Sequence, residues 1–135
     1  MIKSNRRKFL ASVGALATVS VAEGSPINTA AAKKLIAHQV YFWLKNPDSI
    51  QDRAELIKGI KMLRKIESVK KLTVGVVAAT EERTVIDKTW SVSELALFSD
   101  LAGEAAYQVH PIHLDFVKNY SHLWSKVVVY DTIEV

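Results

Sequence analysis

Four stretches of the chain show the alternation of apolar and polar residues, or the enrichment in β-branched residues, that is typical of β-strands. They span residues 35–45, 69–79, 88–98 and 124–133. The second stretch contains Gly75, which predicts a β-bulge because a glycine inside a strand often marks one. Each strand therefore has two distinct faces, and one of them can pack against helices.

Helical patterns occupy the spaces between these strands. Residues 47–49 (Pro-Asp-Ser) are a typical helix start, and apolar residues then recur at helical spacing over residues 50–66. A short helix is predicted over residues 100–109, and a further helix runs from residue 111 to about residue 122. Residues 80–87 form a polar connection between the second and third strands.

The order of elements is β-α-β-β-α-β, which is the order of the ferredoxin-like split. We therefore predict an α+β domain with a four-stranded antiparallel sheet and its helices on one face. Residues 33–135 suffice for one such domain with one hydrophobic core.

The first 32 residues are predicted to be an export signal and linker. The pair Arg6-Arg7 precedes an uncharged run of small and apolar residues over positions 11–22, which resembles a twin-arginine signal. A small-x-small cleavage site lies at residues 20–22, and cleavage near residues 30–32 is an alternative. An uncleaved N-terminal anchor is the competing interpretation. The expected location of the domain is periplasmic or secreted.

Processing would change the charge of the chain. Lys3, Arg6, Arg7 and Lys8 carry four positive charges and Glu23 carries one negative charge, so removal of the first 32 residues takes away three of the formal net charge of +4. The mature domain is then close to neutral, which argues against a nucleic acid partner. No stable membrane association is expected after cleavage. The chain has no cysteine, so it has no disulfide, thiolate nucleophile or Cys-rich metal site.

The clearest chemical motif is the segment 107–113, Tyr-Gln-Val-His-Pro-Ile-His. Proline fits the first position of a helix, so His110 is predicted to cap a helix that begins at Pro111. His113 then lies in the first turn, where the positive end of the helix dipole disfavours imidazolium and leaves a neutral general base. The structural alternative is a core imidazole that braces the helix start by hydrogen bonding.

A carboxylate on a core-facing strand is the second candidate. Glu94 should be costly there unless it is paired, and the expected partners are a histidine or Lys70. Such a group would have a perturbed pKa, whereas a position near a strand end would let it reach solvent. Asp131 either orients an imidazole or simply ends its strand. The two-residue period places these pocket candidates on the helix-covered face: His38, Trp90, Val92, Glu94 and Asp131.

These motifs resemble the stress-responsive dimeric α/β-barrel domains, the Dabb family. The resemblance rests on residues 38–42 (His-Gln-Val-Tyr-Phe), on Gly75, on the run 98–117 with its Tyr-x-x-His-Pro-x-His motif, and on residues 127–131 (Val-Val-Val-Tyr-Asp). It covers essentially the whole mature domain. The resemblance implies a dimeric α/β barrel, in which the sheets of two identical chains pack against each other.

The sequence is also similar to the olivetolic acid cyclase-type plant polyketide cyclases of that family. This similarity implies that His113 is a catalytic histidine and Tyr107 a substrate-holding tyrosine, with His38 and Asp131 in the same pocket. A further pocket histidine of those cyclases corresponds to Val92 here, so the correspondence is incomplete.

A homodimer agrees with the distribution of apolar residues. One face of the predicted sheet has no helix left to cover it, and burial against a second copy would stabilise it by roughly 25 cal/mol per Å² before the cost of association. The residues on this face are Tyr41, Trp43, Val77, Leu95, Leu97, Val128 and Tyr130.

Three functions fit these residues, and a purely structural or interaction role is a further alternative for which the sequence offers no positive motif. The first is cofactor-independent proton transfer on a small carbonyl compound, as in cyclisation or isomerisation, with neutral His113 as base and Tyr107 stabilising the enolate. The second is a binding module for a small apolar or aromatic ligand. Its walls would include Phe42, Trp90, Phe116 and Trp124.

The third is a metal or haem site that uses His38, His110, His113 and a carboxylate. This is the weakest of the three, because His-x-x-His interrupted by proline is poor ligand spacing. We therefore expect no cofactor.

Overall fold

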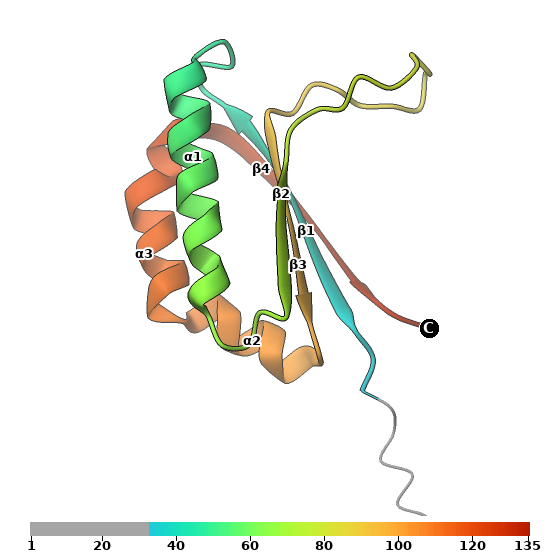
Figure 1. The fold of residues 1–135 in the computed structure, drawn as a ribbon, viewed down its shortest axis with the longest axis vertical. Coiled ribbons are helices and arrows are strands. Elements are labelled where there is room, and N and C mark those ends of the chain that lie inside the picture. The colour runs from blue at the N-terminus through green and yellow to red at the C-terminus, as the bar shows by residue number, and fades with distance from the viewer. Residues whose placement is uncertain (1–32) are drawn as a thin grey trace, which may run out of the picture.

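The computed structural model describes residues 33–135, so the predicted export signal and linker lie outside the described residues. The domain contains four strands and three α-helices in the predicted order, with short 3₁₀ turns after the first and third helices (Figure 1). The elements are β1 Ile36–Leu44, α1 Ile50–Met62, η1 Leu63–Lys65, β2 Lys71–Gly75, β3 Val92–Phe98, α2 Leu101–Val109, α3 Pro111–Tyr120, η2 Ser121–Leu123 and β4 Trp124–Ile133.

The sheet has the strand order β2-β3-β1-β4, and every neighbouring pair is antiparallel. Figure 1 shows the three α-helices together on one side of this sheet. The predicted ferredoxin-like α+β fold is therefore confirmed. None of the helices in residues 33–135 is long and apolar enough to span a membrane.

A side chain accepts a hydrogen bond from one of the free N–H groups at the start of each α-helix. The hydroxyl of Ser49 accepts from the N–H of Asp52 at 3.1 Å, and a carboxylate oxygen of Asp100 accepts from the N–H of Gly103 at 2.8 Å. These caps stabilise the starts of α1 and α2.

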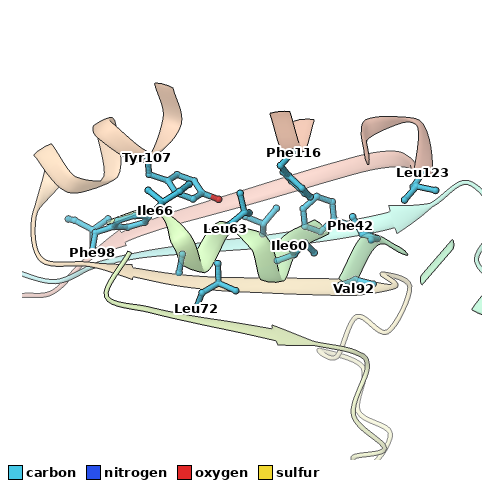
Figure 2. Packing of buried hydrophobic residues seen from close by; sticks show 14 of the residues in the cluster. Phe42, Ile60, Leu63, Ile66, Leu72, Val92, Phe98, Tyr107, Phe116 and Leu123 are labelled. Atoms are coloured by element: carbon cyan, nitrogen blue, oxygen red, sulfur yellow. The ribbon is translucent and has the colours of Figure 1, made fainter. Parts of the chain in front are cut away.

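The core lies between the helices and the sheet, as Figure 2 shows. Each fully buried aliphatic or aromatic side chain contributes roughly 1.5–3 kcal/mol, so this layer is the main source of stability. The residues that Figure 2 labels within it are Phe42, Ile60, Leu63, Ile66, Leu72, Val92, Phe98, Tyr107, Phe116 and Leu123.

Two predictions about the second strand are wrong. β2 ends at Gly75 rather than residue 79, and its pairing with β3 stays in register up to Gly75 opposite Ser93, so there is no bulge at the glycine. The irregularity lies instead in the pairing of β1 with β4, between Trp43 and Leu44. Residues 76–91 leave the sheet and extend to the side away from the helices (Figure 1). The β-branched residues there lack a neighbouring strand, and local propensity alone does not keep them in the sheet.

The third strand also begins later than predicted, at Val92. The chain bends at Ser91, whose N–H donates to the carbonyl of Phe42 at 2.7 Å. Because the strand does not continue through Trp90, the indole lies against Tyr41, with ring centroids 5.2 Å apart. Tyr41 is on the sheet face away from the helices, so the predicted position of Trp90 on the helix-covered face is wrong.

Candidate functional site

The predicted break between α2 and α3 is present and forms one corner of the site. His110 has an extended backbone, and its Nδ1 accepts from the N–H of Ile112 at 3.1 Å, which confirms its capping role. Its Nε2 lies 3.3 Å from a carboxylate oxygen of Glu67. Since His110 is occupied on both sides, the metal set of His38, His110, His113 and a carboxylate is not assembled.

The helix break also orients His113. Pro111 interrupts the helix, and the N–H of Ile112 turns to His110, so the carbonyl of Gln108 loses the partner it would have in a continuous helix. The Nδ1 of His113 lies 3.1 Å from this carbonyl oxygen. A carbonyl can only accept, so Nδ1 carries the proton and Nε2 keeps its lone pair.

The pKa of His113 is lowered, which is the direction that the sequence predicts. Burial lowers the pKa of His113 below its ordinary value of 6.5, against the opposing effect of the Gln108 carbonyl. Partial desolvation is the largest of these contributions, and it favours the neutral imidazole.

Glu94 is paired, but its partner is neither a histidine nor Lys70. The side chain is 2% exposed, which excludes the alternative that it reaches solvent. The hydroxyl of Tyr107 donates to its Oε1 at 2.8 Å. Burial raises the pKa of Glu94 despite this hydrogen bond, and burial is also the main cause of the raised pKa of Tyr107. Both groups therefore favour their protonated forms.

His38 and Asp131 form a second pair across two neighbouring strands. They lie directly opposite each other in the β1–β4 register, and the Nδ1 of His38 is 2.6 Å from Oδ1 of Asp131. The imidazole is nearly buried and meets the rings of Phe98 and Tyr107 edge to face. Asp131 thus holds an imidazole in place, one of the two roles that the sequence allows it.

These groups line a cavity of about 430 Å³ between the sheet and the helices α2 and α3. At one end are His38, Glu94, Tyr107, His113 and Asp131. Following β1 and β4 along their register leads from that end to an apolar end, which is where the predicted aromatic walls other than Trp90 lie. The apolar lining includes Val40, Phe42, Phe116, Trp124, Val127 and Val129.

Three predicted pocket residues do not line this cavity. Val92 is fully buried on the correct face but lies in the core, and His110 and Trp90 lie outside it. The sequence interpretation missed Glu104 on α2, which has a carboxylate oxygen near both His38 and Asp131. Glu104 is three residues before Tyr107, so helical spacing already places both side chains on one face.

Replacing Glu94 by glutamine should stabilise the domain relative to wild type increasingly as the pH rises. Because the pKa of Glu94 is raised above 4.5 by folding, its contribution to stability is fully present below the unfolded pKa and is lost as pH rises through the folded pKa. Glutamine keeps an acceptor for Tyr107 and removes this loss. Thermal unfolding from about pH 4 to about pH 8 measures the difference.

Glu67 provides the matched control, because its carboxyl is exposed and its pKa is lowered, mainly by a backbone hydrogen bond. Glu67→Gln should show no gain in relative stability with rising pH. A difference between Glu94→Gln and wild type that stays constant over the range would contradict the buried, protonated carboxyl.

The fold and the cavity define a ferredoxin-like α+β domain with an acid–base cluster at one end of an apolar pocket. The chain belongs to the Stress responsive A/B Barrel Domain (Dabb) family, which matches residues 36–134. No curated protein matches the chain.

Solved structures show the same fold. A Dabb family protein with a ferredoxin-like fold from Mesorhizobium loti is 22% identical with a TM-score of 0.63, and the match covers 76% of this chain and 98% of that chain. A hydroxynitrile lyase from Passiflora edulis is 21% identical with a TM-score of 0.63, over 76% and 95% of the two chains. A dimeric protein of unknown function from Bacteroides fragilis is 20% identical with a TM-score of 0.58, over 74% and 96%. Identities this low establish the shared fold alone.

Proposed function

We propose that this chain is an exported, homodimeric Dabb-family enzyme that catalyses cofactor-independent proton transfer on a small carbonyl compound. The observation that carries the proposal is the orientation of His113. Its Nδ1 is engaged by the Gln108 carbonyl, and it lines a cavity together with the hydrogen-bonded pair Tyr107–Glu94. A neutral base and a pair of weak acids thus lie in one partly enclosed space.

The chemistry follows from the protonation states. The Nε2 lone pair of His113 would remove a proton from the carbon next to a carbonyl, which leaves an enolate. When Glu94 is protonated, the Tyr107–Glu94 pair holds two O–H groups, of which one joins the two residues and the other can donate to the enolate oxygen. Ionised Glu94 would instead place negative charge beside the enolate and oppose its formation.

Two resemblances support an enzymatic role without identifying a substrate. The motif resembles that of the olivetolic acid cyclase-type proteins, in which the residues matching His113 and Tyr107 act on a carbonyl substrate. One neighbour in fold is a hydroxynitrile lyase, so this architecture holds an active site in another protein.

The test is exchange of α-protons for deuterium in acetophenone and phenylacetone, followed by NMR in D₂O. The rate should exceed that of buffer and should depend on pH as a bell. Activity falls at acid pH as His113 protonates, through a pKa below 6.5, and falls at higher pH as Glu94 ionises, through a pKa above 4.5. Exchange no faster than in buffer with either ketone would reject the proposal.

The second candidate is a binding module, which the apolar end of the cavity favours. Phe42, Phe116 and Trp124 form a continuous group of aromatic rings there, with centroids 5.0–6.3 Å apart. A ligand retained through purification and unchanged on prolonged incubation, together with no α-proton exchange, would favour binding over catalysis.

The homodimer is supported by the open face of the sheet. Leu95 and Tyr130 are exposed there, and the ring of Tyr41 meets those of Trp90 and Tyr130 at 5.2 and 6.2 Å. Several neighbours in fold are described as dimeric. Burial of this face against its copy would remove these side chains from water.

Export by the twin-arginine route is supported by the sequence of residues 1–32. N-terminal sequencing of the protein recovered from the periplasm or medium tests it. A new N-terminus near residue 23 or near residue 33 is expected, and an intact Met1 on all of the protein would reject cleavage.

A further inference from the structure

We propose that a divalent metal ion binds to His38, Glu104 and Asp131, at the polar end of the cavity. The three residues come from β1, α2 and β4. One potential ligand atom of each lies within 4.8 Å of those of the other two. Two carboxylates and one imidazole thus converge from three separate elements.

The local charge favours a cation. Asp131 and Glu104 place two carboxylates around one imidazole, and among the described residues that line the cavity none is a lysine or an arginine. Within residues 33–135, Glu104 accepts from the side-chain amide of Gln108 at 2.7 Å, and Asp131 is hydrogen-bonded to the imidazole of His38. A carboxylate has about four lone-pair sites, so each retains acceptor capacity for an ion. The two carboxylates repel each other, and a bound cation would lower this repulsion.

The three ligands belong to a site that is rigid on one side and open to solvent on the other. His38 is 5% exposed and is held between aromatic rings, and His38 and Asp131 lie on paired strands. The side chain of Asp131 is 54% exposed, so an ion has a path from solvent. In the described structure only one ring nitrogen of His38, Nδ1, has a hydrogen-bond partner. Nε2 is therefore the ring nitrogen that an ion would bind.

The donor set indicates the class of ion. One imidazole nitrogen with two carboxylate oxygens suits zinc or manganese, whereas the absence of sulfur ligands disfavours soft ions. Three protein ligands leave further coordination positions for water or for a ligand that enters the cavity. The site lies beside Tyr107, whose ring centroid is 5.6 Å from that of His38. The metal site goes beyond the proposed proton transfer, because that reaction uses His113, Tyr107 and Glu94 and none of the three metal ligands.

The test is titration of the metal-stripped domain with ZnCl₂ by calorimetry and with MnCl₂ by electron paramagnetic resonance. About one ion per chain should bind, and a hundredfold excess over Kd should raise Tm by roughly 10 °C. Glu104→Gln retains an acceptor for Gln108, and Asp131→Asn retains one for His38. Each substitution should weaken metal binding by about 10–100-fold or more.

Glu67→Gln is the matched control, because Glu67 and His110 form a carboxylate–imidazole pair elsewhere on the domain. It should leave affinity unchanged. Equal affinity in wild type and Glu104→Gln, or no binding of either ion by wild type, would overturn the metal site. The exchange of α-protons is measured separately with EDTA present, so failure of the metal site and failure of the proposed enzyme are distinguishable.

Discussion

Replacing His113 by glutamine should lower the rate of α-proton exchange in phenylacetone by roughly 10²–10⁴-fold, the usual contribution of a positioned general base. The glutamine amide can still donate to the Gln108 carbonyl, as Nδ1 of His113 does. It has no lone pair basic enough to take a proton from carbon. The loss should therefore fall on the rate with little effect on folding, which thermal unfolding checks.

His122 provides the control for this experiment. It is exposed in the turn before β4 and does not line the cavity. His122→Gln should therefore keep the wild-type rate at every pH. An equal loss in the two variants would show that imidazole buffering, and not a positioned base, accounts for the exchange.

Replacing Leu95 by aspartate should convert a dimer into a monomer at micromolar concentration. Leu95 lies on β3, an inner strand, on the sheet face that no helix covers, and it is 37% exposed in the single chain. An unpaired carboxylate buried in an interface costs about 3–5 kcal/mol, and two-fold symmetry places it there twice. The dissociation constant should rise by at least about 10³-fold, as measured by sedimentation velocity.

Leu114→Asp is the matched control for the dimer. Leu114 is 55% exposed on α3, in the helical layer on the other side of the sheet, so the same change of residue should leave the dimer intact. Monomeric wild type, or a dimer that survives Leu95→Asp, would place the interface elsewhere or remove it.

Much of the fold is predictable because its signals are local. Periodicity identified the four strands and the long first helix, and Ser49 and Asp100 marked helix starts that the structure confirms. Pro111 is a strong signal, since a proline both ends one helix and opens the next. The wrong predictions concern residues 76–91, where β propensity is present but a neighbouring strand is not.

The candidate site was predictable only as a set of residues. Strand parity placed His38, Glu94 and Asp131 on one face, and the motif after Tyr107 pointed to His113. Trp90 was assigned to the wrong face because parity holds only while the strand continues, and the chain bends at Ser91. A single sequence holds no signal for where that bend occurs.

The sequence by itself determined the order of elements, the helix break at Pro111 and the capping role of His110, since each depends on backbone geometry within a few residues. Only the tertiary structure decided which acidic and basic groups meet. Glu94 is paired with Tyr107, His38 with Asp131, and Glu104 approaches both members of the second pair. These contacts join residues far apart in the chain, and the burial that perturbs the pKa values of Glu94 and His113 exists only after α2 and α3 pack on the sheet.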